Sequence, residues 1–187
     1  VHTALDGFAG LLRDNKLGID DVEKLEVGLS KMTHVHCAWE YKAQGVTAAQ
    51  MNLFYGLAVI GIDGVAFTDQ YREDRLRDPR ILGFIPRVTA SIDPEIEGKG
   101  PAYRHAARLK LQTRDGRVFE KMILHRRGSP ENPLSAAEVE DKFRHVVGSC
   151  ISKARAARII ELVHALDRAA DPSELLREAS APVGKAG

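Results

Sequence analysis

Two histidines and a cysteine stand together in the segment His34-Val35-His36-Cys37. If this segment is extended, alternate side chains point the same way, so His34 and His36 would share a face, as two ligands of a metal site can. The sequence offers no third ligand at a familiar spacing, and Cys37 would point to the opposite face. Loop histidines near a surface or an interface explain the cluster more simply, so we assign no metal.

Positive charge is concentrated between Lys99 and Arg127, where nine lysines or arginines accompany two acids, Asp115 and Glu120. This surplus could attract an anionic substrate or an acidic partner surface. Charges on the solvated face of a strand explain it equally well. The stretch lacks a regular alternation of basic and aromatic side chains, on which nucleic-acid bases could stack. Since the whole chain also has a net charge of only +1, we expect no nucleic-acid partner.

Length and composition are those of an ordinary globular protein. The 187 residues are 44% hydrophobic and 28% charged, enough for one domain with a sizeable core. No run of 18 apolar residues occurs, so we expect no membrane span, and the first residues lack the features of a signal peptide. Two cysteines, Cys37 and Cys150, make no disulfide framework and indicate a reduced, cytoplasmic setting. The sequence contains no nucleophile elbow, P-loop, dinucleotide fingerprint or Cys-x-x-Cys motif.

The stretch from Thr47 to Gly64 predicts one buried helix, because it is apolar on nearly every side and too short to span a bilayer. Thr47 can cap its start, and Asp63-Gly64 can end it. Tyr55 lies in the middle of this helix, and its phenol must find a hydrogen-bond partner if it is buried. From composition alone, a core tyrosine bonded to the backbone is the simpler interpretation.

The other elements predict an α+β fold, because helices are segregated from a run of hairpin-linked strands. We expect a hairpin over residues Tyr103–His125, turning at Asp115-Gly116, to pair with the strand Val88–Ile92 in an antiparallel sheet. Helices that begin at Thr47 and at Ser135 should cover one face of this sheet, and Ser135 with Glu138 has the spacing of a capping box. We place residues 1–179 in a single domain and predict a disordered tail over 180–187. The remaining expected elements are a strand at Val22–Leu29 and helices at Thr3–Asn15, Asp78–Phe84, Ala154–Leu166 and Ser173–Glu178.

Several separated stretches together resemble the C-terminal half of the MmgE/PrpD family. In chain order they are His2-Thr3-Ala4-Leu5-Asp6, then Gln50 to Ala58 followed by Asp63-Gly64, then Asp78-Pro79-Arg80-Ile81, then Thr113-Arg-Asp-Gly-Arg117, and finally Gly128-Ser-Pro-Glu-Asn-Pro-Leu-Ser135 followed by Lys142-Phe143. The last stretch is the most specific of them. The resemblance covers residues 2 to 178, and it rests on the order and spacing of the pieces together.

This resemblance implies a small α+β lid domain of an enzyme whose larger domain is all helical, with the active site between the two. The family includes 2-methylcitrate dehydratase, iminodisuccinate epimerase and cis-aconitate decarboxylase. These enzymes move a proton next to a carboxylate of a small di- or tricarboxylate without a metal or organic cofactor, so we expect no cofactor. The resemblance also implies that His2 and Tyr55 line the cleft as catalytic residues, His2 to transfer a proton near neutral pH and Tyr55 to donate a hydrogen bond or a proton.

The family's helical domain, and the lysine that shortly precedes its histidine, have no counterpart in this sequence, and Asn52 stands where the family has serine. We therefore leave open whether the chain is an enzyme by itself. One hypothesis makes it a subunit of a split lyase, hydratase or epimerase, completed in an oligomer by a separate helical chain. A second makes it a non-catalytic binding or assembly domain derived from the lid, and a third makes it a fragment of a longer protein. The sequence does not choose among dehydration, epimerisation and decarboxylation.

Overall fold

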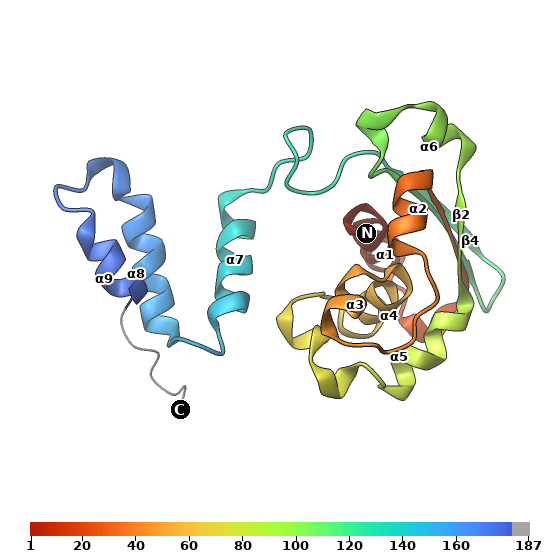
Figure 1. The fold of residues 1–187 in the computed structure, drawn as a ribbon, viewed down its shortest axis with the longest axis horizontal. Coiled ribbons are helices and arrows are strands. Elements are labelled where there is room, and N and C mark those ends of the chain that lie inside the picture. The colour runs from red at the N-terminus through yellow and green to blue at the C-terminus, as the bar shows by residue number, and fades with distance from the viewer. Residues whose placement is uncertain (181–187) are drawn as a thin grey trace. The chain divides into compact units, whose positions relative to one another are not determined.

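A computed structural model of the chain describes residues 1–180. The chain divides into two compact units, Val1–Pro133 and a second one that begins at Leu134, and each is described by itself (Figure 1). The single domain that we expect over residues 1–179 stays a prediction. No helix among these residues is long and apolar enough to cross a membrane.

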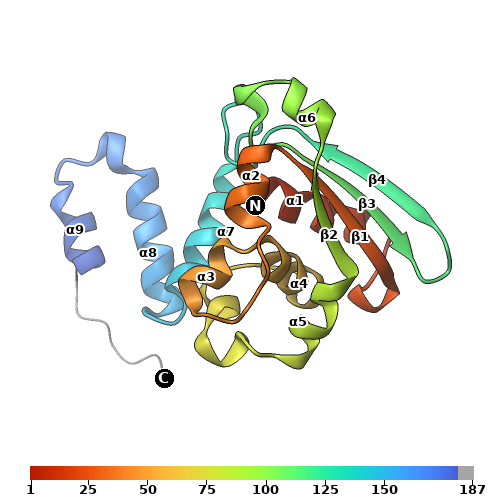
Figure 2. The same cartoon turned by 45° about the vertical axis from the view of Figure 1, so that its right-hand side comes forward.

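The first unit contains a four-stranded mixed sheet in the order β2-β1-β3-β4 (Figure 2). Its strands are β1 (Val22–Leu29), β2 (Val88–Ile92), β3 (Ala107–Thr113) and β4 (Val118–Ile123). Pairing is antiparallel between β1 and β3 and between β3 and β4, whereas β2 runs parallel to β1. The α+β prediction is confirmed, but the expected antiparallel pairing of Val88–Ile92 with the hairpin is wrong. The reason is that β1 occupies the free edge of β3, and a helical crossover connection returns the chain to β1 in the parallel direction.

The predicted hairpin forms and turns at Asp115-Gly116. Gly116 adopts a positive φ of 86°, and the Thr113 N–H donates to the Arg117 carbonyl at 2.9 Å. Such a φ costs glycine little, which is why the Asp-Gly pair marks the turn so clearly. The first strand of the hairpin starts later than expected, at Ala107, because Pro101–Tyr103 forms a turn of 3-10 helix.

Helix α1 (His2–Asp14) packs on β3 and β4 through its apolar face. Helix α1 approaches β3 closely because Gly7 has no side chain. A Cβ at this position would lie 2.4 Å from Cδ1 of Leu109. In Figure 1, α1 and α4 lie on the same side of the sheet, and α4 packs mainly on α1 and α5. The expectation that the helix beginning at Thr47 covers the sheet is therefore revised, and the helix beginning at Ser135 belongs to the second unit. An amphipathic helix such as α1 suits a position between sheet and core, whereas an apolar one suits the interior.

The predicted buried helix is divided in two at Asn52. The structure has α3 (Val46–Met51) and α4 (Leu53–Asp63), with Asn52 fully buried between them. Its Oδ1 accepts from the Tyr55 N–H at 3.0 Å, and its Nδ2 donates to the Trp39 carbonyl at 2.7 Å. An asparagine side chain competes with the helical hydrogen bonds and caps a new helix instead. The predicted end at Gly64 is confirmed, since this glycine is left-handed with φ 74°.

The first unit also contains three short helices, two of them not expected from the sequence. Helix α2 (Lys31–Cys37) replaces the irregular segment that was expected there, because the Ser30 hydroxyl caps its first turn. Helix α5 (Pro79–Phe84) confirms the prediction of a short helix after Asp78, and α6 (Pro94–Gly98) follows β2. Turns of 3-10 helix lie at Ile19–Asp21, Thr68–Tyr71, Glu73–Arg75 and Ile85–Arg87.

The second unit consists of α7 (Ala136–Val147), α8 (Lys153–His164) and α9 (Ser173–Ser180), with a 3-10 turn at Leu166–Arg168. The expected capping box is present: the Ser135 N–H donates to Glu138, and the Glu138 N–H donates to the Ser135 hydroxyl. Oε1 of Glu140 on α7 lies 2.7 Å from Nε2 of His164 on α8. The tail predicted over 180–187 lies, from residue 181 on, outside the described residues.

Candidate functional site

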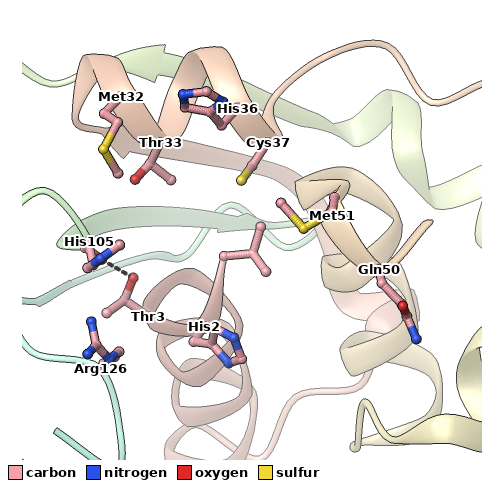
Figure 3. A pocket seen from close by; sticks show the side chains of 11 residues that line it. His2, Thr3, Met32, Thr33, His36, Cys37, Gln50, Met51, His105 and Arg126 are labelled. Carbon is pink, nitrogen blue, oxygen red and sulfur yellow. Dashed lines mark hydrogen bonds between the residues drawn. The ribbon is translucent and has the colours of Figure 1, made fainter. Parts of the chain in front are cut away.

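A cavity of about 430 Å³ lies in the first unit, where the start of α1 faces α2 and the end of α3 (Figure 3). His105 and Arg126, from the segments that flank the hairpin, lie beside Thr3 in this view. Met51 stands at the α3 side. The site therefore gathers five segments that are far apart in the sequence.

The chemistry of the lining is that of a small anion site. Three imidazoles, those of His2, His36 and His105, and the Arg126 guanidinium line the cavity, and none of the described carboxylate side chains does. Methionine, cysteine and threonine side chains, together with Val1 and Gln50, supply the rest of the surface. A few convergent polar groups on a mainly apolar wall are typical of small-molecule sites, and the one sign of charge favours an anionic ligand.

Three buried hydroxyls hold the segment that carries His105. The hydroxyls of Ser30 and Thr33 both donate to the Arg104 carbonyl, each at 2.6 Å, and the Thr3 hydroxyl donates to the His105 carbonyl. Thr3, Ser30 and Thr33 are only 3%, 4% and 5% exposed. Since a partly buried carbonyl is costly without a donor, these three hydroxyls, which we call the hydroxyl clasp, tie the segment to α1 and α2 and place His105 at the cavity.

The surroundings of His105 lower its pKa and so favour the neutral imidazole. Burial lowers its pKa, and the positive charges of Arg104 and Arg126 lower it further. The Arg104 Nε–H donates to His105 Nε2 at 3.1 Å, so this ring nitrogen acts as the acceptor and the proton belongs on Nδ1. A neutral imidazole of this kind can donate a hydrogen bond to an anion without carrying a charge of its own.

The structure brings only one of the two predicted site residues to the cavity. His2 opens α1 and lines the cavity with an exposed ring, which in Figure 3 turns away from α2. Tyr55 is fully buried: its hydroxyl donates to the Gln70 carbonyl at 2.7 Å, its ring lies against Tyr41 and Tyr71, and burial raises its pKa. A catalytic role for either residue stays a prediction.

The histidine–cysteine cluster is helical rather than extended. In α2, residues two apart point to nearly opposite sides, so His34 and His36 do not share a face as the extended interpretation required. His36 and Cys37 line the cavity and His34 does not. Within residues 1–180, no group of three or more His, Cys, Asp or Glu side chains could hold a metal ion. Cys37 and Cys150 are both free thiols.

Most cations of the basic stretch form ion pairs, either with its own two acids or with acids from other elements. Ion pairs join Arg108 to Asp93 at 2.7 Å and to Glu120 at 3.3 Å, Lys121 to Asp14 at 2.9 Å, Lys110 to Glu26 at 3.9 Å and Arg117 to Asp115 at 2.8 Å. The hairpin therefore does not present a uniform anion-attracting face. Arg126, at the end of the stretch, reaches the cavity instead.

Sequence reasoning did not identify His36, His105 and Arg126 as site residues. His36 was visible within the cluster on α2, and the two others belonged to the basic stretch, where nothing distinguished them from solvated neighbours. Their convergence depends on the hydroxyl clasp and on the helical form of α2. The clasp has no signature in the local sequence, whereas Ser30, a preferred N-cap residue, was a local signal for α2.

Comparison with known proteins gives consistent matches. Residues 1–168 match the model of the MmgE/PrpD C-terminal domain. The chain is 29% identical over 173 residues to a cis-aconitate decarboxylase of Aspergillus terreus, which covers 90% of the chain and 35% of the relative. It is 27% identical over 182 residues to a cis-aconitate decarboxylase-like protein of Aspergillus oryzae, and this match covers 94% of the chain and 37% of the relative. The chain thus spans little more than a third of the length of these relatives.

Proposed function

The chain belongs to the MmgE/PrpD family as its C-terminal domain, and from this premise we propose that it forms the lid part of a cofactor-independent lyase for a small tricarboxylate. The relatives are named for cis-aconitate decarboxylation, so this compound is the first substrate to test. Dehydration or epimerisation of a related di- or tricarboxylate would use the same kind of proton transfer. The observation that carries the proposal is the acid-free cavity with three imidazoles and a guanidinium.

A decarboxylation breaks the bond between a carboxylate carbon and its neighbour, releases CO₂ and leaves an electron pair on the remaining skeleton. One proton must then be added to that skeleton, and a positioned histidine is suited to deliver it near neutral pH. We assign this acid to His2, since it lines the cavity and its side chain is exposed. Arg126 would hold a carboxylate as a charged donor, and neutral His105 would add a hydrogen bond without competing for the proton.

The proposal includes a helical MmgE/PrpD N-terminal-like part, in the same polypeptide or in a partner chain of a cytoplasmic oligomer. The chain spans only 35% to 39% of the relatives, which leaves room for such a part. An exposed catalytic ring is also poorly protected from water, and a second domain closing over His2 would exclude it.

The test is to supply the helical part by co-expression and to follow ¹³C-labelled cis-aconitate by NMR. This assay separates CO₂ release from hydration and from isomerisation of the double bond. In the assembled enzyme, His2→Gln should lower kcat by about 10² to 10⁴, the range for loss of a general acid. His34→Gln is the matched control, because His34 lies on α2 next to the cavity without lining it. Unchanged turnover in His2→Gln would remove His2 from the mechanism.

One observation favours the alternative of a non-catalytic binding domain. The Tyr55 hydroxyl is engaged by the Gln70 carbonyl in the core and does not reach the cavity. This alternative predicts that the assembled protein binds tricarboxylates but converts none of them, with the same result for wild type and for His2→Gln.

A further inference from the structure

A second, smaller cavity of about 210 Å³ shares two residues with the first. His105 and Arg126 line both, so these side chains form the wall between the two spaces. Figure 3 shows both residues together at one end of the larger cavity. The smaller cavity continues past them to Arg104 and His125.

The charge of the smaller cavity is also positive on balance. Two guanidiniums and two imidazoles line it, against a single acid, Glu131, whose Oε2 lies 3.8 Å from Nδ1 of His125. The Nε–H of Arg104 is engaged by His105. Among the described residues, no carboxylate lies within 4.0 Å of the Arg126 guanidinium, although Glu131 interacts with it electrostatically at longer range.

The backbone on both sides of Arg126 is fixed by the loop that follows it. The Ser129 N–H donates to the Arg126 carbonyl at 3.1 Å, and the Asn132 amide donates to the His125 carbonyl at 3.3 Å. The Gly128 N–H donates to the Asn132 carbonyl at 2.7 Å, and Gly128 itself has a positive φ of 85°. The Gly-Ser-Pro-Glu-Asn-Pro segment, whose role the sequence left open, thus acts as a rigid support for Arg126.

We propose that the two cavities form one bipartite site, in which Arg126 binds a second carboxylate of the ligand and so selects tricarboxylates over monocarboxylates. This inference rests on the proposed function and deepens it. One carboxylate and the reacting carbon occupy the larger cavity beside His2, and a remote carboxylate lies at the wall, between Arg126 and the cations of the smaller cavity. Arg126 is then a specificity-determining residue rather than the proton donor, and the loop 128–133 positions it.

The test uses unreactive ligands, so its outcome does not depend on catalysis. Calorimetric titration of the full chain with tricarballylate, which has three carboxylates, is compared with titration with butyrate, which has one. Tricarballylate should bind more tightly, and Arg126→Gln should weaken its binding about tenfold while leaving butyrate nearly unchanged, because one charge-assisted hydrogen bond to the remote carboxylate is lost. Arg127→Gln is the matched control, since Arg127 is the adjacent exposed arginine and lines neither cavity.

Equal weakening of both ligands in Arg126→Gln would make this residue a general anion contact and overturn the bipartite site. No change for either ligand, no binding of tricarballylate, or the same loss in Arg127→Gln would overturn it too. The two proposals fail separately. Selective tricarballylate binding without turnover of cis-aconitate would keep the bipartite site and remove the lyase function. Turnover of cis-aconitate that Arg126→Gln leaves unchanged would keep the lyase function and remove the bipartite site.

Discussion

The hydroxyl clasp makes a quantitative prediction, because two of its members donate to the same carbonyl. Ser30 and Thr33 both donate to the Arg104 carbonyl at 2.6 Å, so either can be removed while the other still satisfies it. Thr33→Val removes one buried hydrogen bond and keeps the shape of the side chain, which should lower the free energy of unfolding by about 1 kcal/mol. Ser30→Ala also removes the cap of α2, where the Thr33 N–H donates to the Ser30 hydroxyl, so its cost should be about 2 kcal/mol.

The double variant should cost more than the sum of the two. With both hydroxyls gone, the Arg104 carbonyl is left without either donor in a partly buried position, and this loss adds about 1 to 3 kcal/mol that neither single variant incurs. The expected total is about 4 to 6 kcal/mol, against about 3 kcal/mol for simple addition.

The assay is urea unfolding followed by the fluorescence of Trp39, the single tryptophan, which belongs to the first unit and donates to the His36 carbonyl at 3.1 Å. Ser91→Ala, at an exposed position of β2, serves as the control and should change little. Additive effects of the two substitutions, within about 0.5 kcal/mol, would refute the reasoning that the hydroxyls back each other up.

Three further predictions concern packing, pH and the phenol. Gly7→Ala should destabilise the first unit by about 1 to 3 kcal/mol in the same unfolding assay, because its Cβ would lie 2.4 Å from Cδ1 of Leu109; a neutral effect would mean that α1 can shift freely. Burial pushes the pKa of Asp93 up, but hydrogen bonds from Arg108 and from backbone N–H groups outweigh it and hold the pKa below its usual value. The stability from this carboxylate is therefore present above about pH 4 and lost as the pH falls through the lowered value, and Arg108→Gln should flatten this acid limb of a pH-stability curve; an unchanged curve would contradict the pairing. The family resemblance predicts that Tyr55→Phe preserves the fold by circular dichroism and lowers turnover of the assembled enzyme, although the hydroxyl is bonded to the Gln70 carbonyl away from the cavity; wild-type turnover would leave the phenol a purely structural group.

Local signals in the sequence were sufficient wherever the structure depends on neighbouring residues. The Asp115-Gly116 turn, the Ser135–Glu138 capping box and the end of a helix at Gly64 all form as the sequence indicates. Each is decided by backbone conformation or by side chains within a few positions, so chain-distant contacts have little influence on it. The family resemblance drew on the same kind of information, because short motifs in a fixed order were enough to recognise it.

Tertiary structure decided which strand pairs with which and what lies in the cavity. The sequence has no signal that β1 rather than β2 takes the edge of β3, because both strands are short and only modestly patterned. The break at Asn52 likewise depended on a distant acceptor, the Trp39 carbonyl. Pairing and capping of this kind are settled by which groups must be satisfied once the core closes.

The cavity is the clearest case of this difference. His2 could be proposed from its motif, but the imidazole of His105 joined it through carbonyls held by hydroxyls from other elements, and the guanidinium of Arg126 through the loop that fixes its backbone. Most other cations of the basic stretch found acids on neighbouring strands and helices. Residue type and spacing therefore determined what chemistry the chain could offer, while hydrogen-bond satisfaction and charge pairing in the folded unit determined which of those side chains stand together to perform it.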